Sequence, residues 1–236
     1  MHNTSKKSVV LDLDLPGAQE TARKLALSAD IVLEDYPVGY LSARGLGYEQ
    51  LRSQKPSLVY TSVTGFGQTG PHAGWAYADI VGQAMGGLMH VNGDAEHGPV
   101  RITAPQSHAQ VNLQAAVGAM IALFARGGNG GVGQHVDVSM QEAVANALDN
   151  TQQTWDIRGV NPSGPGIYRN SDGVPHQRYL FETADGWVAC LRIGGLSTVD
   201  ANAIIDWMAE HGEARDLDSP VWRARLPSLQ PLTPEG

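Results

Sequence analysis

Apolar residues cluster in four short segments whose pattern predicts β-strands. They are residues 8–13 (SVVLDL), 29–35 (ADIVLED), 58–66 (LVYTSVTGF) and 134–140 (QHVDVSM). Each segment is short and rich in β-branched residues, as strands are. Pro16 predicts the start of a helix over 16–30, because proline's missing N–H costs nothing in a first turn. Strand, helix and strand in this order predict a right-handed βαβ unit, and a short helix stopped by Pro56 follows.

The longest helical pattern lies between residues 107 and 126 and predicts a core helix. Its large apolar side chains are Val111, Leu113, Val117, Met120, Ile121, Leu123 and Phe124. They point all round the helical wheel, which predicts a helix buried on most faces. Arg126 ends the pattern, and GGNGGVG is too rich in glycine to stay helical. After the strand at 134–140, residues 140–155 resume a helical period, so the whole stretch predicts part of an α/β core.

Glycine and proline mark two further features of the chain. The segment GFGQTGPHAGW (65–75) follows a buried strand, and open α/β sheets bind ligands at the carboxyl ends of their strands. Residues 162–175 are dense in Pro and Gly and predict a linker. Beyond it, 179–193 predict a hairpin with Asp185-Gly186 at its turn, 204–212 predict a helix, and the proline-rich tail 226–236 predicts disorder. The domain prediction is therefore 1–160, a linker at 161–176, and a second domain beginning in 177–236.

Composition and charge exclude several classes of function. The chain has 236 residues, 42% of them hydrophobic, enough for one sizeable domain or a domain and a half. A formal charge of −8 gives no electrostatic support for binding nucleic acid. No apolar run approaches the roughly 20 residues of a membrane span, and the N-terminus has no signal-peptide core. We therefore expect a cytoplasmic protein without a nucleic-acid or membrane partner.

Cysteine and histidine usage predicts neither a disulfide framework nor a metal site. The single cysteine, Cys190, lies in an apolar run and reads as core filler in a reducing compartment. Five histidines, at positions 72, 90, 97, 108 and 135, do not have a metal-ligand spacing such as H-x-x-x-H. The glycine loop GGNGGVG lacks the Lys-Ser/Thr pair of a phosphate-binding P-loop.

An ordered string of motifs gives the chain a family resemblance. The motifs are Lys7-Ser8, Leu11-Asp12-Leu13, Ala29-Asp30-Ile31, Glu34 to Gly39, Gly45-Leu46-Gly47-Tyr48, Pro56 to Tyr60, Gly65-Phe66-Gly67-Gln68, Gly70-Pro71, Asp79, Gln83-Ala84, Ala122-Leu123, Arg126, Gly131, Gly133-Gln134 and Val136-Asp137-Val138-Ser139. Each is weak alone, but the order is specific. On these motifs the chain resembles the class III CoA-transferases (CaiB/BaiF type), which include formyl-CoA and carnitine CoA-transferases and α-methylacyl-CoA racemases.

The resemblance implies a fold, substrates and a partner. It implies an α/β fold: a Rossmann-like open parallel sheet, followed by the start of a smaller second domain. Family members form interlocked homodimers, bind coenzyme A as an acyl-CoA substrate, and move it between carboxylic acids. They also begin with a glycine-rich strand–turn–helix and continue well past the equivalent of Gly236. The expectation is therefore a fragment that lacks the usual N-terminal segment and most of the small domain.

The resemblance also locates the catalytic position, where the residue differs. In the family's transferases an aspartate attacks the acyl-CoA carbonyl, and its position falls on His108. Three hypotheses stay open for His108: a substituted nucleophile or base, a mark of lost transfer with CoA binding retained, or an inert polar residue at a helix start. The racemase histidine position falls on Ala78, which argues against racemization. Tyr77, one residue away, is either packed or a shifted substitute.

Coenzyme A binding is the better preserved part of the resemblance. The family's CoA-binding loop places Asp35, Tyr36 and Gly39 at the cofactor, with Tyr36 able to stack on adenine. Leu11 is expected to line the adenine pocket, and Arg44 is the nearest cation for a phosphate. The predicted function is CoA transfer between carboxylic acids. The alternatives are an acyl-CoA hydrolase, lyase or epimerase that uses His108, and a non-catalytic CoA-binding subunit.

Overall fold

The computed structural model describes residues 3–94, 98–148, 151–161, 168–169, 177–178, 180–189 and 198–225. These residues belong to two compact units. The first comprises Met1–Gly166 with Asn170–Val174, and the second comprises Ile167–Arg169 with Pro175–Gly236. Each unit is described by itself below.

A three-stranded parallel sheet forms the centre of the first unit. Its order is β1 (Ile31–Glu34), β2 (Val59–Thr64) and β5 (His135–Ser139). The register pairs Ile31 with Val59 and Tyr60 with His135. All three strands coincide with apolar segments of the sequence, and the predicted α/β fold with an open parallel sheet is confirmed.

The first predicted strand, residues 8–13, is wrong. This segment is extended but unpaired, and Val9 and Val10 are largely exposed. Its Asp12 side chain accepts a hydrogen bond from the backbone N–H of Asp14, which turns the chain towards α1 (Pro16–Ser28). The parallel strand–helix–strand unit is therefore formed by β1, α2 (Tyr48–Arg52) and β2, with the short helix η1 (Ser42–Arg44) before α2.

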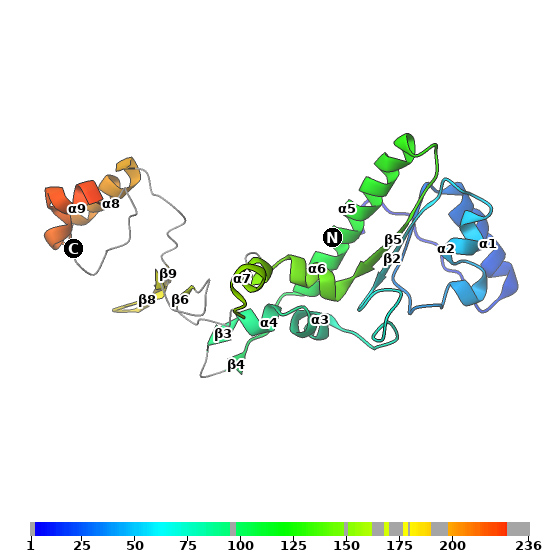
Figure 1. The fold of residues 1–236 in the computed structure, drawn as a ribbon, viewed down its shortest axis with the longest axis horizontal. Helices are drawn as coiled ribbons and strands as arrows, with labels where there is room; N and C mark the ends of the chain where they lie inside the picture. Colours follow the sequence, from blue (N-terminus) through cyan, green and yellow to red (C-terminus); the bar gives the residue numbers. More distant parts are fainter. Residues whose placement is uncertain are drawn as a thin grey trace. The chain divides into compact units, whose positions relative to one another are not determined.

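The two faces of the sheet pack against different helices (Figure 1). On one face, Tyr60 packs with Leu51, Leu58 and residues of α1 and α2. On the other face, Val63 and Val138 pack with residues of α5 (Gln106–Gly128) and α6 (Met140–Asn146). Because side chains alternate along a strand, this second face carries Thr61, Val63, Val136 and Val138, and the first carries Tyr60, Ser62, Thr64, His135 and Asp137. The more polar side chains of β2 and β5 thus share one face.

Helix α5 is buried along one side only, so the prediction of burial on most faces is wrong for this chain alone. Its sheet-facing side is made of Val111 and small residues such as Ala115, Ala119 and Ala122. Its other side exposes a stripe of large apolar residues, which we call the α5 apolar face: Leu113, Val117, Met120, Ile121 and Phe124, between 46% and 88% exposed. Among the described residues, α5 is also long and apolar enough to span a membrane, with a mean hydropathy of 1.2. Its packing against β2 and β5 is that of a core helix.

The end of α5 is fixed to the amino ends of the strands. The Arg126 guanidinium donates to Asp30 Oδ1 and to the Ser57 carbonyl, both at 3.0 Å. After the glycine loop, the Gly133 N–H donates to the Pro56 carbonyl at 2.8 Å. The predicted helix at 140–155 is divided into α6 and α7 (Thr151–Arg158). Between β2 and α5 lie α3 (Asp79–Met85), α4 (Leu88–Val91) and the small hairpin β3 (Gly93–Asp94) and β4 (Gly98–Pro99).

Within its described residues, the second unit contains two small antiparallel pairs and three helical segments. Strands β6 (Tyr168–Arg169) and β7 (Gln177–Arg178) pair, as do β8 (Leu180–Thr183) and β9 (Gly186–Ala189). The latter pair is the hairpin that the sequence predicts, with Asp185 in its turn. Helix α8 (Thr198–Glu210) contains the predicted 204–212 helix almost entirely, followed by η2 (Arg215–Asp218) and α9 (Pro220–Arg225). Cys190, most of the predicted linker and the tail 226–236 lie outside the described residues.

Candidate functional site

The loops at the carboxyl ends of β1 and β2 enclose two cavities that share Pro37. This is the edge at which open α/β sheets bind ligands. One cavity is polar and extends over the face of the sheet that carries Tyr60 and Ser62. The other is apolar and lies between the loop after β1 and the loop after β2.

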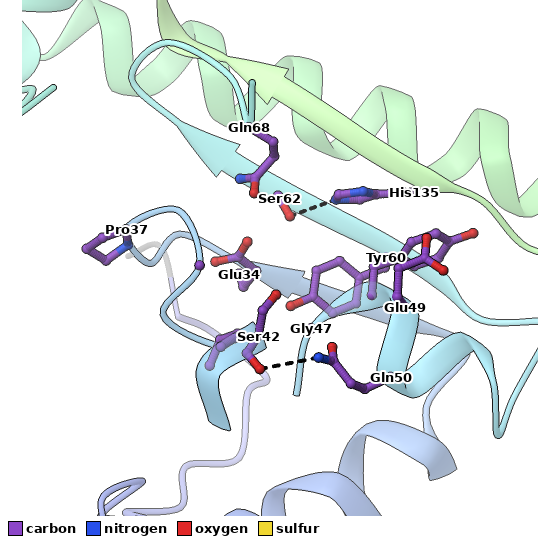
Figure 2. A pocket seen from close by; sticks show the side chains of 13 residues that line it. Glu34, Pro37, Ser42, Gly47, Glu49, Gln50, Tyr60, Ser62, Gln68 and His135 are labelled. Carbon is purple, nitrogen blue, oxygen red and sulfur yellow. Dashed lines mark hydrogen bonds between the residues drawn. The ribbon is translucent and has the colours of Figure 1, made fainter. Parts of the chain in front are cut away.

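The polar cavity has a volume of about 270 Å³ and is shown in Figure 2. It is lined by Glu34, Pro37, Gly39, Leu41, Ser42, Gly47, Tyr48, Glu49, Gln50, Tyr60, Ser62, Gln68 and His135. The buried Ser62 hydroxyl lies 2.9 Å from Nε2 of His135, which comes from the neighbouring strand. The His135 ring stacks on Tyr48 at 4.9 Å. With its hydroxyl against the sheet and 1% exposure, Ser62 is a satisfied buried polar group and is not an accessible nucleophile.

A buried carboxylate controls the electrostatics of the polar cavity. Glu34, at the end of β1, is 8% exposed, and its Oε2 accepts a hydrogen bond from the Tyr36 N–H at 2.8 Å. Burial, and next the Glu34 charge, raise the pKa of Tyr60 far above its ordinary value. The Tyr60 hydroxyl therefore stays protonated and donates to the Leu46 carbonyl at 3.2 Å. The cavity is a neutral-to-negative environment that favours hydrogen-bond donors.

The apolar cavity has a volume of about 500 Å³. Its lining residues are Pro37, Val38, Thr64, Ala73, Gly74, Trp75, Ala76 and Tyr77. The Tyr77 ring lies directly over Gly65, where an added Cβ would approach the ring to 2.6 Å, so that glycine is required for the contact. Burial, and next the negative charges of Asp35 and Glu34, raise the pKa of Tyr77. Tyr77 is packed against the core beneath α5, as one of the two hypotheses for this residue held.

His108 lies in the first turn of α5 and is held by Asp79, the first residue of α3. Its Nδ1 lies 3.3 Å from Asp79 Oδ1, which also accepts the backbone N–H groups of Ser107 at 3.0 Å and of His108 at 3.4 Å. Gln83 donates to Asp79 Oδ2 at 2.7 Å. Asp79 therefore caps the N-terminus of α5 from a neighbouring helix, where the local cap residue, Pro105, provides no side-chain hydrogen bond.

Asp79 is an ionised, largely buried group. Burial alone raises its pKa, but the hydrogen bonds donated by Gln83, His108 and Ser107 together outweigh burial and leave the pKa below its ordinary value. Asp79 is one of the family-motif residues, and the sequence alone assigns it no role. The spacing of four residues between Asp79 and Gln83 is the sequence feature that indicates contact between their side chains, because residues one helical turn apart are neighbours. The His108 side chain is half exposed and lines neither cavity, although Tyr77, which lines the apolar one, is two residues from Asp79.

Three of the predicted CoA-binding residues lie on one short loop and its following turn. Tyr36 stacks on Tyr40 at 4.8 Å, and the Arg44 guanidinium lies 3.8 Å over the other ring of this pair, Tyr40. Arg44 also donates to Asp14 Oδ1 at 2.6 Å, and this hydrogen bond raises the Arg44 pKa, so the guanidinium stays charged. Gly39, with a φ of +84°, lies in the wall of the polar cavity.

The other two predicted CoA-binding residues lie outside the cluster of Tyr36, Tyr40 and Arg44. Asp35 is exposed between Glu34 and Tyr36, and Leu11 is half-buried in the segment before α1. His108 belongs to a different element, the start of α5. Within the residues that the structure describes, no group of three or more His, Cys, Asp or Glu side chains could hold a metal ion.

Comparison with known proteins identifies the family. The model of "CoA-transferase family III" matches residues 1–213. The chain is 36% identical over 211 residues to the "Succinyl-CoA:(R)-benzylsuccinate CoA-transferase subunit BbsE" of Thauera aromatica, covering 89% of this chain and 50% of that protein. It is 34% identical over 160 residues to the "Succinate--glutarate CoA-transferase" of Agrobacterium fabrum, covering 68% of this chain and 40% of that protein.

Solved structures agree with the sequence comparison. The crystal structure of a CAIB/BAIF family protein from Brucella suis superposes with a TM-score of 0.74 and 27% identity, over 96% of this chain and 60% of that one. The chain spans about half the length of the curated relatives it matches. With the family motifs in order, the parallel sheet in place and the family model matching most of its length, the chain belongs to CoA-transferase family III.

Proposed function

We propose that this protein binds an acyl-CoA and transfers coenzyme A between carboxylic acids. The observation that carries this proposal is that the family motifs at 34–39, 65–71 and 79–84 lie in the loops and the helix start next to the carboxyl ends of β1 and β2. Proteins similar to this chain are named as transferases that act on succinyl-CoA or succinate. For this chain, the identity of the acyl-CoA and that of the acid are part of the proposal.

The Arg44–Tyr40–Tyr36 cluster is the proposed site for the charged, aromatic end of coenzyme A. A stacked tyrosine pair supplies a flat surface for adenine, and a guanidinium supplies a partner for a phosphate. The Asp14 carboxylate, which is largely exposed, forms an ion pair with that guanidinium. A phosphate would therefore compete with Asp14 for this guanidinium.

This competition makes a test of the CoA site. Arg44→Ala should weaken CoA binding about tenfold, the loss expected for one charge-assisted contact. Asp14→Asn should tighten it, because it removes the competing carboxylate. Arg52→Ala is the matched control, since Arg52 also lies over a tyrosine ring, that of Tyr48, outside the cluster. Calorimetric titration with CoA measures all three, and equal effects of Arg44→Ala and Arg52→Ala would exclude this site.

His108 is the proposed acyl acceptor in place of the family's aspartate. In the tautomer whose Nδ1–H donates to Asp79, Nε2 carries a free lone pair. Attack of Nε2 on the thioester carbonyl forms an acyl-imidazole and releases the CoA thiolate. The acceptor carboxylate then takes the acyl group as a mixed anhydride, and attack of the thiolate on the acceptor's carbonyl gives the new thioester and the first acid. Water in place of the acceptor would give hydrolysis.

Intact-mass measurement after incubation with a panel of acyl-CoAs, with a hydroxylamine or borohydride quench, tests the acyl acceptor. We expect an acyl adduct that disappears in His108→Ala and returns, as a carboxylate adduct, in His108→Asp. An adduct that maps to another carboxylate would support the transferase function and exclude His108 as the acyl acceptor. Tight CoA binding with no adduct would instead identify a CoA-binding subunit, the alternative function.

The α5 apolar face supports the proposal that the protein works as an interlocked homodimer. Five large apolar side chains in one exposed stripe are a surface that a partner subunit can bury. Phe124→Ser should reduce the dimer population in sedimentation, whereas Ile157→Ser, an equally exposed apolar site on α7, should not. The proposed setting is the cytoplasm, without nucleic-acid or membrane partners, and co-sedimentation of the protein with phosphatidylglycerol vesicles would contradict that setting.

A further inference from the structure

We propose that the apolar cavity beside Trp75 receives the side chain of the carboxylic acid and selects acids with an uncharged apolar or aryl group over dicarboxylic acids. The inference rests on the proposed function, because it assigns the acid that such a transferase would use. It concerns a different surface from the Arg44 cluster and a different property from acyl transfer by His108. It can therefore fail on its own.

The position of the cavity suits an acid-binding pocket. Its lining includes Thr64, the last residue of β2, and Tyr77. Ala78 follows as the cap of α3, and then Asp79, whose carboxylate holds His108. The lining residue Tyr77 is thus two positions from Asp79, the residue that holds His108.

The chemistry of the lining favours an apolar group. Val38 and Trp75 present large apolar surface to solvent at the cavity, being 38% and 53% exposed. Thr64 is already engaged, because its hydroxyl accepts a hydrogen bond from the Gly67 N–H at 2.9 Å. A ligand that covers Val38 and Trp75 removes their apolar area from water.

Charge argues against a second carboxylate in this cavity. None of its eight lining residues carries a charge, so within this described pocket a distal carboxylate has no cation to pair with. Burial is the main cause of the raised Tyr77 pKa, and the negative charges of Asp35 and Glu34 raise it further. A distal carboxylate placed in this cavity would therefore lose hydration without a charged lining residue to pair with.

The Trp75 indole is held in place, which favours a flat aryl ligand. It lies 4.0 Å from the His72 ring and 5.8 Å from the Phe66 ring, the latter nearly perpendicular to it. Aromatic rings that pack in this way have few alternative rotamers and offer a pre-formed face for stacking. The indole face that is still exposed is the surface available to the acid.

Direct binding of two probe acids tests the inference without any catalytic step. The probes are 3-phenylpropionate and succinate, and saturation-transfer NMR with the 236-residue protein measures the affinity for each. We expect 3-phenylpropionate to bind at least about fivefold more tightly than succinate, and Trp75→Ala to remove that advantage. Trp155→Ala is the matched control, because Trp155 is 54% exposed and lies on α7, away from the cavity.

A second variant, Val38→Lys, tests the charge argument by gain of binding. A cation placed in the wall should raise the affinity for succinate severalfold and lower that for 3-phenylpropionate. Succinate binding as tightly as 3-phenylpropionate to the unmodified protein, or equal effects of Trp75→Ala and Trp155→Ala, would overturn the inference. If no acyl-CoA is turned over but the preference and its loss in Trp75→Ala are observed, the proposed function fails while the pocket assignment stands.

Discussion

Replacing Asp79 by asparagine should destabilise the first unit, because Asp79 joins two helices through hydrogen bonds to a charge. Its Oδ1 accepts the backbone N–H groups of Ser107 and His108, and its Oδ2 accepts from Gln83. Hydrogen bonds to charged groups contribute about 1.5–3 kcal/mol each, and a helix cap about 1 kcal/mol. An asparagine oxygen can still accept one of them, so we expect a net loss of about 2 kcal/mol at pH 7.

The loss should depend on pH in a defined direction. The folded-state pKa of Asp79 lies below its ordinary value of 3.8, so its ionised form is favoured by folding. That contribution is fully present above the unfolded pKa and is lost as the pH falls through the folded one. Asp79→Asn has no such proton to gain. The stability gap between wild type and variant should therefore be largest at neutral pH and should shrink below about pH 4.

Urea unfolding followed by circular dichroism measures both effects. With a urea dependence near 2 kcal/mol per molar, a loss of about 2 kcal/mol lowers the midpoint by about 1 M. Asp30→Asn is the control, because that carboxylate is largely exposed and its pairing with Arg126 should contribute at most about 1 kcal/mol. A gap that stays constant between pH 7 and pH 3.5, or one no larger than that of Asp30→Asn, would refute the capping argument.

Three further predictions concern the sheet and its attachments. Gly133→Ala should lower the stability by more than about 2 kcal/mol, because an added Cβ would overlap the backbone carbonyl of Leu58. Gly127→Ala is the contrast: an added Cβ there meets no other atom, so thermal unfolding should show α5 stabilised by about 0.5 kcal/mol. Tyr60→Phe should cost about 1 kcal/mol by removing the buried hydroxyl's hydrogen bond, and one tyrosine fewer should resist ionisation in alkaline difference spectra. Arg126→Ala should cost about 1–2 kcal/mol through its two lost hydrogen bonds, with a smaller loss in Arg126→Lys, as read from urea midpoints.

Local sequence patterns predict the strands that are paired, but they do not show which neighbours are present. The segments of β1, β2 and β5 are recognisable because each is short, apolar and bounded by turn residues. Residues 8–13 have a similar pattern, yet a strand requires a partner in register, and within the described residues this segment has none. The same reasoning applies to α5, whose apolar residues encircle the helix although the sheet covers one side. Periodicity measures what a segment could bury, and packing decides what it does bury.

The candidate site depends still more on contacts between distant residues. The Ser62–His135 hydrogen bond joins residues 73 positions apart, and it exists because the register of β2 and β5 sets Tyr60 opposite His135. The pairing of the Gln68 N–H with Asp137 follows from the same register. In neither pair does the sequence around one residue predict its partner. The family motifs located the loops, and the register of the strands arranged the polar side chains within them.

The cap of α5 is separable from the side chain at position 108. Asp79 caps α5 through the backbone N–H groups of Ser107 and His108, and any residue except proline at position 108 would still supply the second of these. The cap therefore does not require an imidazole, and an aspartate at position 108 is compatible with the helix start. His108→Asp should therefore keep the helix start but lose about 1 kcal/mol or more through repulsion between two neighbouring carboxylates. A variant that folds in this way carries a carboxylate at an intact helix terminus. Under the proposed function, a difference in acyl transfer between it and the wild type would then report the side chain at position 108 and not the loss of the helix start.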